Sequence, residues 1–170
     1  FYGCSGLTML TLHCQTVDDW FSGNTSIMTV IMGNEVTSIG QSAFSGCSGL
    51  TVAAIPNSVT SIGYRAFNNC SSLTSVRIPN GVKSIGNSTF YGCSSLTVAT
   101  IPNSVTSIGE QAFYNCSSLR SMTIPSGVTN IGKQAFYNCS NLGSVTIPDG
   151  VTMLEAGAFG WCTGLTSVSI

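Results

Sequence analysis

The chain has 170 residues, which is the size of one ordinary domain, and it carries very few charges. Only 6% of its residues are charged, against about 25% in a typical soluble domain, and the formal net charge is −1. Such a balance excludes the basic surface that nucleic acid or anionic lipid requires. Apolar runs also stop far short of the roughly 18 residues of a membrane span, so we expect neither a nucleic-acid partner nor membrane insertion.

A repeat of 23 residues runs through the sequence. Successive phenylalanines are first 20 and then always 23 residues apart, at Phe1, Phe21, Phe44, Phe67, Phe90, Phe113, Phe136 and Phe159. The five prolines follow the same period, at Pro56, Pro79, Pro102, Pro125 and Pro148. A fixed period of this length is typical of a solenoid, in which each unit buries its apolar face against the next.

The first unit, at the start of the chain, departs from this pattern. It is three residues short, and Gly33 stands where later units have proline. Its segment 13–24 holds the only histidine, His13, together with Cys14, which lies off the repeat, and the adjacent acids Asp18 and Asp19. A solitary histidine and two acids without a third carboxylate form no catalytic or calcium-binding constellation. We therefore expect no enzymatic activity, no metal and no cofactor.

Later units place their predicted elements in one order, which residues 119–141 show clearly. Apolar and polar residues alternate near the end of segment 119–124, which predicts a short strand that Pro125 ends. Gly132 then opens a turn, and segment 132–136 favours one turn of α- or 3₁₀-helix that points Phe136 inward. We predict eight parallel strands beginning at Leu7, Ile27, Leu50, Leu73, Leu96, Leu119, Leu142 and Leu165.

The unit LxxVxIPxxVxxIGxxAFxxC resembles the 23-residue leucine-rich repeat of the BspA-like (Treponema pallidum-type) family over essentially the whole chain. This resemblance implies a repeat solenoid, a right-handed superhelix with a parallel sheet on one face and short helical turns or irregular segments on the other. It also implies a cell-surface or secreted protein, since several members are implicated in adhesion. We expect residues 1–170 to form a single array of about seven repeats, the first shortened, within a longer protein.

Cysteine occupies one slot of the repeat, three residues after phenylalanine. The slot predicts a structural ladder of buried thiols that donate to loop carbonyls, formed by Cys47, Cys70, Cys93, Cys116, Cys139 and Cys162. Parallel side chains in one column do not converge as a disulfide requires, and a single line of thiols cannot surround a tetrahedral metal. Asn24 fills the same slot after Phe21 and can donate similarly. Cys14 remains a candidate disulfide partner for Cys4 or for a cysteine of a preceding unit.

Outward strand positions form two columns that are more apolar in the N-terminal half of the chain. An exposed apolar patch marks a contact surface, so the candidate binding residues are Met9, Met28, Ile31, Val52, Ala54 and Arg77. One alternative explanation is strand propensity, since β-branched Thr and Val suit strands. For the two valines a second alternative is that Val52 or Val98 fills core volume that Ala53 or Ala99 leaves empty.

Three tyrosines form a second candidate surface on the outer edge. Tyr91, Tyr114 and Tyr137 each follow a phenylalanine directly, and tyrosine is favoured at interfaces; the alternative is that they only cover the turn. The sequence thus predicts a non-enzymatic scaffold for adhesion or protein–protein binding, whose partner is a host or extracellular-matrix protein or another copy of itself. The alternative function is a structural spacer or a self-associating array that stacks through uncapped ends.

Overall fold

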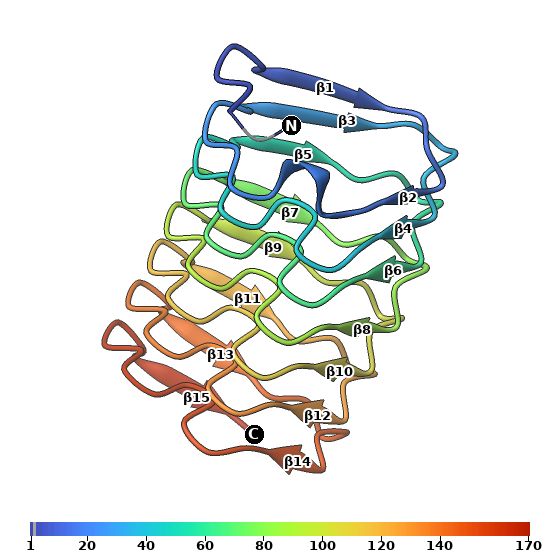
Figure 1. Cartoon of the computed structure of the whole chain (residues 1–170). Coiled ribbons are helices and arrows are strands. Elements are labelled where there is room, and N and C mark those ends of the chain that lie inside the picture. The colour runs from blue at the N-terminus through green and yellow to red at the C-terminus, as the bar shows by residue number, and fades with distance from the viewer. Residues whose placement is uncertain (2) are drawn as a thin grey trace.

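The computed structural model describes residues 1 and 3–170 and shows an elongated solenoid with two stacks of parallel strands (Figure 1). Within these residues the first stack holds eight strands: β1 (Met9–Leu12), β3 (Thr29–Met32), β5 (Val52–Ala54), β7 (Ser75–Arg77), β9 (Val98–Thr100), β11 (Ser121–Thr123), β13 (Ser144–Thr146) and β15 (Ser167–Ser169). The second stack holds seven: β2 (Thr16–Val17), β4 (Ser38–Ile39), β6 (Ser61–Ile62), β8 (Ser84–Ile85), β10 (Ser107–Ile108), β12 (Asn130–Ile131) and β14 (Met153–Leu154).

The eight predicted strands are confirmed as the first stack, each beginning two residues after its predicted start. The second stack was not predicted. Its strands are only two residues long, too short for an alternating pattern to be recognised in the sequence. Their register is regular, and Ile39 pairs with Ile62 as Ile108 pairs with Ile131.

From Phe44 to Phe159 the segments around the phenylalanines are consecutive turns, so the predicted helical turn does not form there. Two residues of each of these segments adopt left-handed backbone angles, as Gln111 (φ 55°) and Asn115 (φ 57°) do on either side of Phe113. A right-handed helix cannot pass through such residues. Instead, the N–H groups of these three residues donate to carbonyls of the next turn, at 2.9, 2.7 and 2.9 Å. These bonds make a third line of contact between turns, and Phe113 still points inward.

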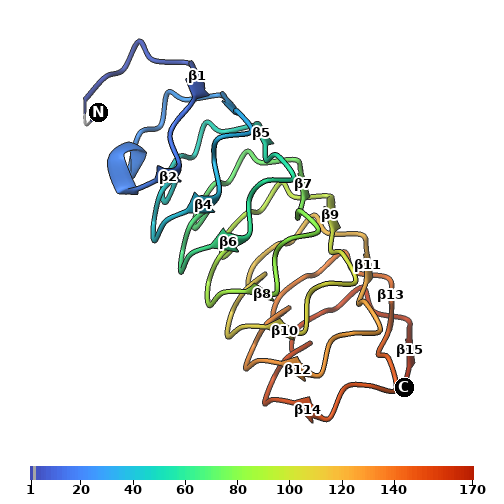
Figure 2. The same ribbon diagram turned by 90° about the vertical axis from the view of Figure 1, so that its right-hand side faces the viewer.

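Within the described residues the one helix is a 3₁₀-helix, η1 (Asp19–Phe21), in the shortened first unit. The chain is two residues shorter between the starts of β1 and β2 than between those of β3 and β4, and one residue shorter between β2 and its phenylalanine. This second deletion removes the room for two successive turns, so the chain reaches Phe21 through a tight helical turn. Figure 2 shows η1 beside β2 at the N-terminal end of the stack.

A single core fills the space between the two stacks. All eight phenylalanine rings stack in one column, with neighbouring ring centroids 5.0–5.8 Å apart and ring planes within 18° of parallel. The five rings that are completely buried belong to Phe44, Phe67, Phe90, Phe113 and Phe136. Because every unit adds the same ring to the same column, each unit is stabilised by its neighbours on both sides.

Candidate binding surfaces

The strand face, which we define as the outward side chains of the first stack and of the residue before each strand, carries the predicted apolar patch. The side chains of Met9, Met28, Ile31 and Val52 are between 42% and 60% exposed. Ala54 and Arg77 are exposed as well. Parallel pairing of β1, β3 and β5 brings the five apolar residues onto neighbouring strands, with Ile31 opposite Ala54. Arg77 lies on the following strand, β7.

The alternative explanation for the two valines is wrong. Val52 and Val98 are 49% and 51% exposed, while Ala53 and Ala99 occupy the inward positions between the pairs of outward residues. Turning either valine inward would shift its strand by one residue and send every other side chain to the opposite face. The valines therefore add to the apolar surface and not to the core.

The C-terminal part of the strand face has a different chemistry. Its outward positions on β11, β13 and β15 are all exposed hydroxyl residues: Ser121, Thr123, Ser144, Thr146, Ser167 and Ser169. The face thus divides into an apolar part on β1 to β5 and a hydroxyl part on β11 to β15. A partner with an apolar surface gains more by burying the first part than the second.

A shallow groove of about 320 Å³ lies on the strand face between β9 and β11. Its lining consists of Val98, Ala99, Thr100, Ile101, Ser121 and Thr123. In the part of the chain that the structure describes, the ladder of the first stack is interrupted at two places, between β5 and β7 and between β9 and β11, and that of the second stack at one, between β6 and β8. Each interruption of the first stack follows a strand whose inward residue is alanine, Ala53 or Ala99, which offers the next strand less packing surface than valine or methionine. The groove was not predicted from the sequence, although the two alanines were its signal.

The cysteine slot builds a ladder of hydrogen bonds inside the solenoid. Each thiol donates to the carbonyl of a phenylalanine 26 residues earlier at 3.1–3.3 Å, and the donors are Cys47, Cys70, Cys93, Cys116, Cys139 and Cys162. Asn24 reaches the carbonyls of Phe1 and Cys4 with its amide nitrogen at 3.4 Å. Burial raises the pKa of Cys47 to about 11 and that of Cys93 to about 12. Thiols that stay protonated at neutral pH are poor nucleophiles and poor metal ligands.

The three tyrosines of the outer edge form a stacked ladder. Ring centroids lie 4.8 Å apart from Tyr91 to Tyr114 and 5.1 Å apart from Tyr114 to Tyr137. Amide ladders run beside the rings, since Gln111 donates to Gln134 at 3.0 Å and Asn138 donates to Asn115 at 2.9 Å. Both faces of the Tyr114 ring are covered by its two neighbours, so only its edge and hydroxyl group are available to a partner.

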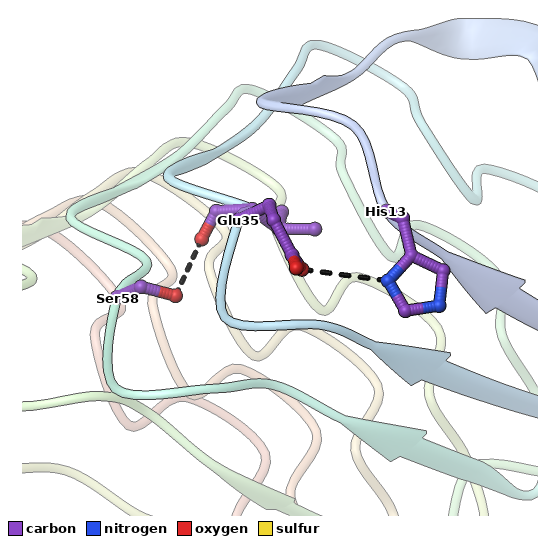
Figure 3. Close-up of polar contacts among 4 residues, drawn as sticks. His13, Glu35 and Ser58 are labelled. Carbon is purple, nitrogen blue, oxygen red and sulfur yellow. Dashed lines mark hydrogen bonds and ion pairs between the residues drawn. The ribbon is translucent and has the colours of Figure 1, made fainter.

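His13 contacts Glu35 at the shortened corner, with Nδ1 and Oε2 3.4 Å apart (Figure 3). A Cβ atom on Gly33 would lie 2.9 Å from this nitrogen, so glycine in the proline slot leaves room for the contact. A backbone hydrogen bond within Glu35 and then the His13 side chain lower the pKa of the carboxyl group. Both side chains are exposed, and exposed pairs contribute little to stability. Among the described residues no three His, Cys, Asp or Glu side chains gather where they could hold a metal ion.

Two parallel stacks, a phenylalanine column and a 23-residue period define a leucine-rich-repeat solenoid. The chain belongs to the BspA-type leucine-rich repeat family, whose model matches it in six copies over residues 1–97 and 83–170. Proteins of this family and fold are scaffolds built from repeats, and such repeats generally mediate contacts between proteins. No helix in the described part of the chain is long and apolar enough to cross a membrane.

Three solved structures illustrate the similarity. The leucine-rich repeat protein of T. pallidum is 30% identical with a TM-score of 0.74, over 95% of this chain and 73% of that one. A leucine-rich repeat protein from Bacteroides ovatus is 33% identical (TM-score 0.64) over 79% of this chain. A leucine-rich cell surface protein from Faecalibacterium prausnitzii is 27% identical (TM-score 0.53) over 98% of this chain. The matches span 41% and 60% of the latter two proteins, and the curated protein sequences give no match.

Proposed function

We propose that the protein is a non-enzymatic scaffold at the cell surface or in the secreted fraction, and that it mediates adhesion or protein–protein binding through the apolar part of its strand face. The observation that carries this proposal is the group of large apolar side chains, Met9, Met28, Ile31 and Val52, exposed together on three neighbouring strands. Monomeric soluble proteins rarely leave such a group uncovered unless it serves a contact. Shape and apolar area dominate the contact because charges are scarce.

The proposed location has support from the family and from a relative. The protein from F. prausnitzii is described as a leucine-rich cell surface protein, and the match covers 98% of the present chain and 60% of that protein. A protein at the surface meets host and extracellular-matrix proteins, which are the partners we propose, together with other copies of the same chain.

Capture of extracellular-matrix proteins by the immobilised chain tests the proposal. The double change Val52→Asp with Ala54→Asp places two carboxylates on the apolar part and is expected to reduce capture at least about tenfold, since buried unpaired charges are costly at an interface. Ser144→Asp with Thr146→Asp changes the equivalent positions of β13 and is expected to leave capture unchanged. Equal capture by both variants and the original protein would overturn the proposed binding surface.

A structural spacer or self-associating array is the second candidate function. It is favoured by the apolar part of the strand face, because a second copy of the chain can cover these exposed side chains as well as another protein can. Self-association predicts a molar mass that rises with concentration in static light scattering. A constant monomer mass over a hundredfold range of concentration would remove this candidate.

A further inference from the structure

We infer that the groove between β9 and β11, together with Arg77 and Arg120, receives an extended acidic segment of the partner protein. An apolar side chain of the segment enters the groove, and carboxylates on either side of it pair with the two arginines. This inference rests on the proposed protein-binding function and names the chemistry of the partner.

The strand face carries positive charge and no negative charge. Arg77 and Arg120 are its only charged residues, and both are exposed. All six carboxylates of the chain belong to other segments: Asp18, Asp19, Glu35, Glu110, Asp149 and Glu155. Within residues 1 and 3–170, the one ion pair joins His13 and Glu35, so neither arginine has an internal partner. Arginine binds carboxylates through two parallel hydrogen bonds, which makes an acidic group its fitting partner.

The two arginines lie on opposite sides of the groove. Arg77 pairs in register with Thr100 on one side of the groove, and Arg120 directly precedes Ser121 on the other. They are two strand spacings apart across the stack and three residues apart along it. With about 4.8 Å per strand and about 3.3 Å per residue, their backbones are roughly 14 Å apart on the diagonal. Four residues of an extended chain span about 13 Å, which matches this diagonal.

This match defines the pattern of the segment. In an extended chain, residues at positions one, three and five point to the same side. Acidic residues at one and five can therefore reach the arginines while an apolar residue at three enters the groove between Val98 and Ser121. The apolar floor formed by Val98, Ala99 and Ile101 favours such a side chain.

The backbone is also open at the groove. No backbone hydrogen bond joins residues 97–101 to residues 120–124 in the described structure, whereas β7 and β9 on one side and β11 and β13 on the other are paired. The facing N–H and C=O groups of β9 and β11 are therefore further apart than hydrogen-bond distance, which leaves room on the face for a side chain of the segment. A nucleic acid fits less well, since two arginines neutralise few phosphates and the groove has no aromatic side chain on which a base could stack.

A designed peptide tests the inference directly. It carries glutamate at its first and fifth positions, leucine at the third and serine elsewhere, with a fluorescent label for anisotropy measurements on the intact chain. We expect saturable binding that weakens as sodium chloride is raised, and a loss of at least about tenfold in affinity for Arg77→Ala, for Arg120→Ala and for Val98→Asp. Arg65→Ala is the matched control, because Arg65 lies over the Tyr64 ring and away from the strand face.

The outcomes separate this inference from the proposed function. Equal affinity of the original protein and the Arg77→Ala and Arg120→Ala variants would overturn it, as would equal binding of a peptide whose leucine is replaced by serine. Displacement of the peptide by a short single-stranded DNA at equal concentration would assign the arginines to polyanions in general and would also overturn it. If the peptide fails while Val52→Asp with Ala54→Asp still abolishes matrix-protein capture, the inference is wrong and the proposed function stands.

Discussion

The inward columns of the solenoid and its strand face follow opposite rules. The phenylalanine slot holds the same residue in all eight positions, and its rings keep almost the same separation from end to end. On the strand face one column changes from Met9 through Val52 to Ser144. An inward side chain contacts the side chains in the same slot of the turns before and after it. A smaller residue in one turn therefore weakens the packing of all three turns. Outward residues contact solvent and are free to vary toward a partner.

The largest expected effect comes from breaking the phenylalanine column at its centre. The Phe90 ring is completely buried between Phe67 and Phe113, 5.5 and 5.3 Å away. Phe90→Ala should lower the free energy of unfolding by about 3–5 kcal/mol, measured by urea titration followed by circular dichroism. Phe1→Ala is the control, since its ring is 63% exposed and contacts one neighbour only; its loss should stay near 1 kcal/mol. Equal losses would contradict the account of the column.

A second effect comes from the glycine that opens the turn in five units, at Gly40, Gly63, Gly86, Gly109 and Gly132. A Cβ atom at Gly109 would lie 2.8 Å from the nitrogen of Asn87 and 2.9 Å from the carbonyl carbon of Gly86, so the backbone of the preceding turn would have to move. Gly109→Ala should therefore cost about 1–3 kcal/mol in thermal or urea unfolding.

Gly143→Ala is the matched control for this substitution. The nearest atom to a Cβ at Gly143 is the carbonyl oxygen of Arg120 at 4.0 Å, so the added methyl group has room. A cost for Gly143→Ala as large as that for Gly109→Ala would show that the close approach of the turns is not the cause.

These residues also mark what the sequence could and could not predict. The spacing of phenylalanine and proline is a direct consequence of stacking, so the solenoid and the strands of the first stack could be predicted. The turns around Phe113 were not predicted. The slot of Asn115 did carry a signal, since it holds glycine or asparagine in five of the six turns of this kind and these residue types readily adopt left-handed angles, whereas Gln111 carries none. Hydrogen bonds to the next turn hold these angles in place, and such bonds between distant residues leave no local pattern. The groove was not predicted for a similar reason, since its formation depends on how Ala99 packs against the following turn.

A third effect concerns the thiol column and pH. Burial raises the pKa of Cys93 from its ordinary value of 9.0 to about 12. Between these values the unfolded chain releases the thiol proton and the folded chain keeps it, so stability falls as pH rises through this range. One such thiol contributes about 1.4 kcal/mol per pH unit. Urea titrations between pH 8 and 11 should give a shallower fall for Cys93→Ala than for the original protein. Parallel slopes would rule out the buried thiol as the cause.

The smallest expected effect lies on the strand face. Val52→Asp with Ala54→Asp changes two exposed side chains of β5, so the free energy of unfolding should change by less than about 1 kcal/mol. Circular dichroism during urea unfolding checks this directly. A loss comparable to that of Phe90→Ala would mean that the face contributes to folding as the inward columns do.

The direction of the thiol bonds has a consequence for growth of the chain on the ribosome. Cys70 reaches back to the carbonyl of Phe44, while the N–H of Phe44 donates forward to the carbonyl of Ala66. Every loop is therefore completed only when the next turn has been synthesised. At about 5–20 residues per second, a 23-residue turn waits roughly one to five seconds for the turn that completes it. Throughout synthesis the newest turn therefore lacks these hydrogen bonds to a following turn. Completion of the solenoid lags at least one turn behind translation.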